Sequence, residues 1–296
     1  MGGGPGRVPS PATPGGTLYV VATPIGNLGD VTLRAIEVLR AVPLIAAEDT
    51  RVTRRLLARY EIPTRAVSYH ARSGPARERE LLDHLAGGAD LALVTDAGTP
   101  IVSDPGEGLV AAWAAAGGAV VAIPGASSVL AAVASSGVAG PRWSFEGFLP
   151  RSGRERRERL AAIGADERGS VLFEAPGRLA ATLRDLAAAC GASRPGAVCR
   201  ELTKLHEQVT RASLGTLATL ADDGTIPARG EMVVVVGWGE GSGPAPAEAD
   251  PAAALDAARA EVDRLAESGL PRGEAAKRVA AATGLPRRSL YRQGRS

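Results

Sequence analysis

Short apolar runs separated by amphipathic segments are the feature that most constrains the fold of this 296-residue chain. In the first half of the chain, these runs are 17–22, 44–47, 66–69, 91–94 and 119–123. Buried strands that alternate with helices are typical of a parallel sheet covered on both faces. The sequence therefore predicts an α/β domain over residues 17–140.

The second half repeats the alternation and then changes in composition. Strands are expected at 143–148, 170–175, 197–202 and 232–238, with helices between them. These segments predict a second α/β domain over 141–240. Residues 241–251 are rich in Gly, Pro and Ala and are interpreted as a linker. Residues 252–296 are expected to form a small helical module of the helix-turn-helix kind, suited to RNA, and 1–16 a disordered tail.

Composition places the chain among globular proteins of a reducing compartment. Hydrophobic residues make up 45% and charged residues 22%, with a net charge of +2. No run has the length and apolarity of a membrane helix, and the start does not resemble a secretory signal. Cys190 and Cys199 form neither a disulfide framework nor a metal-ligand pattern. We therefore expect a cytoplasmic location, no membrane partner and no metal.

Three loops at the carboxyl ends of strands combine Gly with Pro and small hydroxyl residues. They are 23–30, 95–106 and 124–128. In open parallel sheets, ligands bind beyond the carboxyl ends of the strands, and Gly allows the backbone to approach a ligand closely. The first loop contains Gly26 and Gly29 and lacks the G-x-G-x-x-G pattern, which disfavours a dinucleotide. A ligand without a pyrophosphate is expected.

Several of these segments carry a resemblance to a known family. VATPIGNLGD, LVTDAGTPIVSDPG, IPGASS, FEGFLPR, RELTKLHE and GEMVVVVG occur in this order. Together they resemble the ribosomal RNA small subunit methyltransferase I family, a branch of the tetrapyrrole methylases. The resemblance implies a two-domain class III methyltransferase fold of the α/β class. Its first sheet would be mainly parallel and its second sheet mixed.

The same resemblance implies an activity and its partners. Members transfer a methyl group from S-adenosyl-L-methionine to the ribose 2′-hydroxyl of a cytidine, cytidine 1402, in the 16S ribosomal RNA of the 30S subunit. A homodimer is implied as well. By matching motifs, the expected cofactor contacts are Pro24, Asp96, Gly98, Thr99, Val102, Ser127, Ser128 and Met232.

Three residues are candidates for the group that accepts the proton of the hydroxyl. Lys204 is one of only two lysines, and a lowered pKa would make it a base. A charged Lys204 would instead hold an RNA phosphate or form a salt bridge to Glu201 or Glu207. Asp49 ends the second strand, where it is either catalytic or the cap of the next helix. His70 ends the third strand, where a hydrogen-bonding role in the loop is the alternative. The sequence after His70, ARSGPARE, departs from the family pattern and weakens a role for a histidine pair.

Arginine-rich segments predict where RNA binds, because Arg suits both phosphates and splayed bases. The candidates are Arg51, Arg54, Arg55, Arg154, Arg156 and Arg157. Two other functions remain open at this point. One is a tetrapyrrole or diphthine methyltransferase on the same fold. The other is a ribosome-assembly factor without catalysis.

Overall fold

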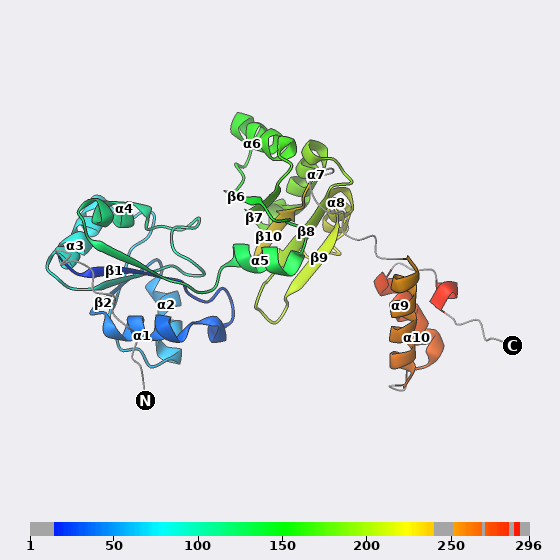
Figure 1. Cartoon of the computed structure of the whole chain (residues 1–296), viewed down its shortest axis with the longest axis horizontal. Helices are drawn as coiled ribbons and strands as arrows, with labels where there is room; N and C mark the ends of the chain where they lie inside the picture. The colour runs from blue at the N-terminus through cyan, green and yellow to red at the C-terminus, as the bar shows by residue number, and fades with distance from the viewer. Residues whose placement is uncertain (1–14, 240–250, 268–269, 284–286, 291–296) are drawn as a thin grey trace. The chain divides into compact units, whose positions relative to one another are not determined.

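The computed structural model describes residues 15–239, 251–267, 270–283 and 287–290 (Figure 1). The predicted tail lies almost wholly outside the described residues, and so does the predicted linker except for Pro251. Packing divides the chain into two units, 1–241 and 242–296, so both expected α/β domains fall within the first unit. Each unit is described by itself.

The first sheet is fully parallel, with strand order β3-β2-β4-β1-β5. Its strands are β1 (Thr17–Val21), β2 (Leu44–Ala47), β3 (Ala66–Ser68), β4 (Leu91–Val94) and β5 (Ala119–Ile123). The helices between them are α1 (Leu33–Ala41), α2 (Thr50–Arg59), α3 (Pro75–Ala86) and α4 (Glu107–Ala115). The short helix η1 (Leu28–Asp30) precedes α1. This confirms the parallel sheet expected from the apolar runs.

Alternation along the strands divides the core of this half into two layers. On β4, Ala92 and Val94 pack with the buried faces of α1 and α2, whereas Leu91 and Leu93 pack with α3 and α4. Successive side chains of a strand point to opposite faces, so a strand covered by helices on both sides must be apolar throughout. Figure 1 shows the two helix pairs on the two faces of the sheet.

The second sheet is mixed, with strand order β6-β7-β10-β8-β9. Its strands are β6 (Trp143–Phe148), β7 (Gly169–Glu174), β8 (Pro195–Arg200), β9 (Gln208–Ser213) and β10 (Met232–Val236). Only β6 and β7 pair in parallel; the other pairs are antiparallel. The helices of this half are α5 (Ser128–Ser136), α6 (Gly153–Ala165), α7 (Leu179–Cys190) and α8 (Leu214–Asp222), with η2 (Pro176–Arg178) before α7.

Helix α5 covers one face of the second sheet, and α6, α7 and α8 cover the other. The central strand β10 reads MVVVV, and all five residues are buried because it lies between two strands under both helix layers. The mixed sheet that the resemblance implied is therefore confirmed.

The second unit contains α9 (Pro251–Glu267), α10 (Arg272–Thr283) and the short helix η3 (Arg287–Leu290). Val262, Ala276, Val279 and Leu290 form its small core. Across the described residues of both units, no helix combines the length and the apolarity needed to cross a membrane.

Candidate active site

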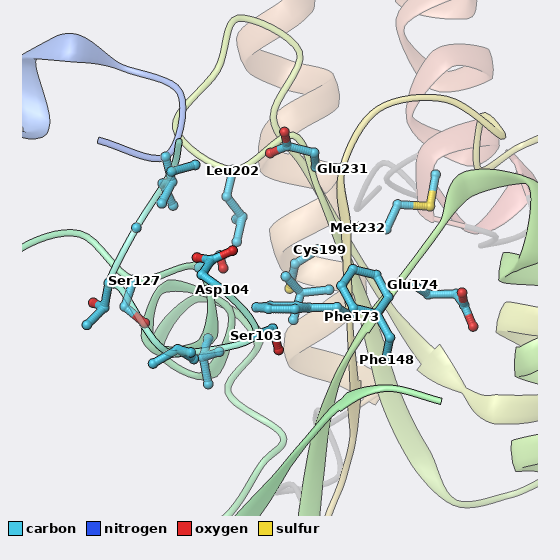
Figure 2. Close-up of a pocket in the computed structure, with 18 of the residues that line it drawn as sticks. Ser103, Asp104, Ser127, Phe148, Phe173, Glu174, Cys199, Leu202, Glu231 and Met232 are labelled. Carbon is cyan, nitrogen blue, oxygen red and sulfur yellow. The ribbon is translucent and has the colours of Figure 1, made fainter. Parts of the chain in front are cut away.

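A cavity of about 320 Å³ lies within the first unit, beyond the carboxyl ends of β4 and β5 (Figure 2). One wall comes from the loops that follow these two strands. The opposite wall comes from the second sheet: Phe148 at the end of β6, Phe173 on β7, Cys199 on β8 and Met232 on β10. The two sheets together thus enclose a mainly apolar space with a few polar groups, the usual character of a small-molecule site.

Main-chain hydrogen bonds join two of the Gly- and Pro-containing loops next to the cavity. The amide of Thr23 donates to Gly98 O at 2.9 Å, and the amide of Gly98 donates to Thr23 O at 3.0 Å. The Thr23 hydroxyl also donates to Thr95 O at 3.0 Å. Because Gly98 has a φ of 83°, it takes a backbone conformation that other residues adopt at a cost. The pairing therefore depends on glycine at this position.

The loop after β4 also contains two residues in the left-handed region that are not glycine. Ile101 has a φ of 78° and Ser103 a φ of 68°. For a β-branched residue this conformation is an outlier, and such strain costs on the order of 1–3 kcal/mol per residue. Strained backbone of this kind occurs where surrounding structure holds a functional loop in one shape. Here it places Val102, Ser103 and Asp104 along the cavity.

Most of the expected cofactor contacts come together at this cavity. Gly98, Thr99, Val102, Ser127, Ser128 and Met232 line it, whereas Pro24 and Asp96 do not. Pro24 is buried beside the Thr23–Gly98 pair, and Asp96 accepts a hydrogen bond from the amide of Asp49 at 3.0 Å. Met232 is only 3% exposed, so it both fills the core and borders the cavity.

Lys204 forms ion pairs in this structure. Its Nζ donates to Glu201 Oε1 at 2.9 Å and lies 3.1 Å from Glu231 Oε2. Burial alone would lower the pKa of Lys204, but its hydrogen bonds and ion pairs with Glu201 and Glu231 raise that pKa above the ordinary value. A base requires the opposite shift. Of the roles that the sequence left open for Lys204, the salt bridge to Glu201 is present, and the second partner is Glu231 rather than Glu207.

Asp49 forms a helix cap. Its carboxylate accepts from the Arg51 amide at 2.8 Å and contacts the Arg51 guanidinium through both oxygens. The hydrogen bonds from Arg51 lower the pKa of Asp49 to about 2, which makes it a weak proton acceptor. His70 is exposed, and its ring Nδ1 accepts from the Arg72 amide at 3.1 Å. Asp49, His70 and Lys204 all lie outside the cavity lining.

The arginine candidates separate into exposed and buried groups. Arg51, Arg54, Arg55, Arg154 and Arg157 are exposed; Arg51 pairs with Asp49, and Arg154 pairs with Glu158. The prediction that Arg156 presents its charge to RNA is wrong. Its side chain is only 10% exposed, and its guanidinium is held by Asp185, Thr182 and the Pro150 carbonyl.

Sequence reasoning missed several residues of the cavity. Asp104, Phe148, Phe173 and Glu231 line it without having been singled out. Asp104 and Phe148 lie within the segments SDPG and FEGFLPR, so they were part of the pattern that carried the resemblance. The signal that could have identified Asp104 and Phe148 is an acidic or aromatic residue next to a glycine in these segments.

Known proteins with similar sequences identify the family of this chain. Residues 17–218 match the family described as Tetrapyrrole (Corrin/Porphyrin) Methylases. The ribosomal RNA small subunit methyltransferase I of Synechocystis sp. is 46% identical over 276 residues, covering 93% of this chain and 96% of that protein. The enzyme of the same name from Xylella fastidiosa is 42% identical over 280 residues, covering 95% and 99%. The chain belongs to the ribosomal RNA small subunit methyltransferase I family.

Solved structures agree on the fold of this methyltransferase. Uroporphyrin-III-C-methyltransferase from Thermus thermophilus aligns with a TM-score of 0.55 and 19% identity, covering 75% of this chain and 94% of that one. A cobalt precorrin-4 methyltransferase aligns with a TM-score of 0.57 and 17% identity, covering 78% and 98%. A further structure of the Thermus enzyme is a complex with S-adenosyl homocysteine. As a member of this family, the chain is a methyltransferase that uses S-adenosylmethionine.

Proposed function

We propose that this methyltransferase methylates the ribose 2′-hydroxyl of a cytidine in 16S ribosomal RNA, cytidine 1402, within the 30S subunit. The observation that carries the proposal is full-length similarity, at 42–46% identity, to relatives named for methylation of small-subunit ribosomal RNA. Such a substrate implies a cytoplasmic enzyme. We also propose the homodimer that the family resemblance implied.

The cavity fits S-adenosylmethionine in size and charge. A space of about 320 Å³ suits a ligand of that size, and apolar residues such as Ile25 and Val129 offer surface for its adenosine part. The carboxylates of Asp104 and Glu231 line the same cavity and favour a cationic sulfonium. We assign the contacts to Gly98, Thr99, Val102, Ser127, Ser128 and Met232. Pro24 and Asp96 would support the loops from behind.

The bound donor supplies a methyl group attached to a positively charged sulfur. The protein's own contribution is to hold the acceptor oxygen in line with that carbon–sulfur bond. Fixing two reactants in this way can supply roughly 7–11 kcal/mol of the barrier. The strained loop at Ile101–Ser103 and the paired loops at Thr23 and Gly98 provide rigid backbone for this task.

Exposed arginines would bring the RNA to the cavity. Arg54 and Arg55 lie on the exposed face of α2, and Arg157 lies on the exposed face of α6. We retain Arg51 and Arg154 as weaker candidates, because their acidic neighbours compete with phosphate. Contacts to phosphate supply most of the affinity for nucleic acid that does not depend on its base sequence.

A transfer assay tests the function directly. Purified protein is incubated with methyl-labelled S-adenosylmethionine and, in separate reactions, unmethylated 30S subunits, free 16S RNA and uroporphyrinogen. We expect label in the ribose of one cytidine, with the 30S subunit as the preferred acceptor. Label in the macrocycle, or transfer to a base instead of a ribose, would contradict the proposal.

A further inference from the structure

At the cavity, the second sheet meets the loop that follows β4 of the first sheet, and we call this contact the junction. A Cβ built on Gly147 of β6 would lie 3.3 Å from Ser103 Oγ of the loop after β4. Gly147 has a φ of 61° and lies where the β6–β7 register shifts between Phe145 and Gly147. A bulge of this kind redirects the side chain that follows it. The next residues on the two segments are Phe148 and Asp104, and both line the cavity (Figure 2).

Phe148 presents an unusual surface for a large apolar side chain. Phe148 is 56% exposed. The other two phenylalanines of the chain, Phe145 and Phe173, pack behind it. The ring of Phe148 lies 5.5 Å from that of Phe173, and Phe173 lies 5.0 Å from Phe145 in an edge-on arrangement. The pair behind Phe148 therefore supports an aromatic ring at the edge of the cavity. Splayed RNA bases stack on such rings.

Asp104 is the carboxylate of the cavity that remains available to a ligand. Among the described residues that line the cavity, three are carboxylates: Asp104, Glu174 and Glu231. The Glu174 side chain has no exposed surface and is engaged by Arg178, Thr182 and the Ala175 amide. The Glu231 carboxylate pairs with Lys204. The Asp104 carboxylate is half-buried and has no ion-pair partner among the described residues.

The surroundings of Asp104 suit a proton acceptor near neutral pH. Burial and then the charge of Glu48 raise the pKa of Asp104 to about 6; the Thr95 hydroxyl lowers it, and Asp96 raises it further. Glu48 and Asp96, which act on it electrostatically, follow the ends of β2 and β4. An acid with this pKa is ionised at neutral pH and still holds a proton firmly enough to act as a base.

We propose that the acceptor nucleoside binds at this junction, with its base stacked on Phe148 and its 2′-hydroxyl at the Asp104 carboxylate. This subsite rests on the proposed function. As the hydroxyl oxygen forms its bond to the methyl carbon, the carbon–sulfur bond breaks and its electron pair stays on sulfur. The hydroxyl proton passes to Asp104, so the products are the methyl ether and neutral S-adenosylhomocysteine. Gly147 leaves room for Ser103, so the segments that carry Phe148 and Asp104 approach each other at the cavity.

Variants at the two positions give different signatures in the transfer assay. Phe148→Ala is expected to raise KM for 30S subunits about tenfold, which is within the range for loss of one base–aromatic stack. Its KM for S-adenosylmethionine should stay unchanged, and Phe148→Tyr should retain wild-type values. Leu33→Ala is the matched control, because Leu33 is an exposed apolar residue on α1, away from the cavity. A rise in KM for S-adenosylmethionine alone would overturn the base-stacking part.

Asp104→Asn is expected to lower the single-turnover rate at least 100-fold when that rate is measured at saturating S-adenosylmethionine. In the wild type, the logarithm of that rate should rise with pH up to about 6 and then level off, since the carboxylate must be ionised. Asp104→Glu should restore part of the rate and move the acid limb. Asp83→Asn, a change of an exposed aspartate on α3, is the control. Persistence of the acid limb in Asp104→Asn would overturn the proton-acceptor role.

These outcomes separate failure of the subsite from failure of the function. If the wild type methylates cytidine ribose and both variants behave as the wild type, the subsite is wrong and the function stands. If the wild type does not methylate ribosomal RNA, both are wrong. Donor binding measured by calorimetry and thermal unfolding of each variant verify that an inactive variant is folded.

Discussion

Gly26 lies directly against the side chain of Lys204, so that a Cβ at position 26 would overlap Lys204 Cγ and approach Lys204 Cε to 3.0 Å. The first loop of the parallel sheet thereby contacts the loop between β8 and β9. Lys204 in turn holds Glu201 and Glu231, and Glu231 lines the cavity. Because Gly26 has no side chain, Lys204 has room to pair with the carboxylate of Glu231 in the second sheet.

The first prediction concerns this contact. Gly26→Ala should displace Lys204 from its two glutamates and reduce the transfer rate roughly tenfold, because small misplacements at a site have large effects on rate. Thermal unfolding and the single-turnover rate measure the two consequences. Gly74→Ala is the control, since a Cβ there meets nothing within 4 Å. A wild-type rate in Gly26→Ala would show that the Lys204 cluster does not position the cavity.

The second prediction concerns the charge of Lys204. Its raised pKa means that the stabilisation from its pairs is fully present below the ordinary value of 10.5 and is lost as pH rises through the raised value. Lys204→Met should therefore lower the free energy of unfolding by about 1 kcal/mol at neutral pH. Denaturant titrations should show the difference from wild type shrinking only in strongly alkaline solution. A transfer rate that titrates with Lys204 near pH 7 would restore it as a base.

The third prediction follows from the raised pKa of Asp104. The pKa of Asp104 in the folded protein, about 6, lies above the ordinary value of 3.8. Asp104 therefore favours folding most below pH 3.8, where it is protonated in both states, and this contribution is lost as pH rises through 6. Asp104→Asn cannot ionise, so it should be more stable than the wild type at pH 8 by roughly 1–2 kcal/mol. The two proteins should converge near pH 4. Equal stability at pH 8 would indicate that the Asp104 charge is solvated.

The fourth prediction separates two neighbouring arginines of α6. Arg156→Ala should lower the free energy of unfolding by roughly 2–3 kcal/mol, because Asp185 and Thr182 would lose their buried partner. Arg157→Ala, at an exposed position, should change stability by no more than about 0.5 kcal/mol. Urea unfolding monitored by circular dichroism compares them. Similar losses in both variants would contradict the buried role of Arg156.

The fifth prediction concerns RNA affinity. Replacing Arg54, Arg55 and Arg157 by Ala should weaken binding and flatten the dependence of log K on log salt by about 0.7 per lost phosphate contact. Fluorescence anisotropy with a decoding-centre RNA at several salt concentrations measures the slope. Arg79→Ala on α3, a helix on the opposite face of the first sheet from α2, provides the control. An unchanged slope in the triple variant would remove these residues from the RNA surface.

Sequence patterns predicted the elements well where packing is uniform along a segment. LALV and MVVVV lie between helix layers on both faces, so each residue is apolar and the strand is visible in the sequence. Asp49 was also correctly offered as a cap, because the capping bond is local. These features depend on neighbours within a few positions of the chain.

The parts of the site that escaped prediction depend on distant neighbours. Arg156 looks like its exposed neighbours in sequence, and only the approach of α7 buries it beside Asp185. The pKa of Asp104 is raised by burial and by the charges of Glu48 and Asp96, which follow other strands. The pKa of Lys204 is raised rather than lowered because Glu201 is joined by Glu231, which arrives from a segment 27 positions later. Burial and charge of this kind arise from the pairing order of the strands, which no local pattern contains.

Main-chain groups pair Thr23 with Gly98 in both directions, and the Thr23 hydroxyl adds bonds to Thr95 O and Gly98 O. This scaffold of paired loops therefore needs no side chain from the opposite wall of the cavity. Side chains on the opposite wall, such as Phe148, are free to be exchanged without loosening that scaffold. A fold built in this way permits a change of acceptor through substitutions on one wall alone, which makes this enzyme a suitable starting point for redesigning what it methylates.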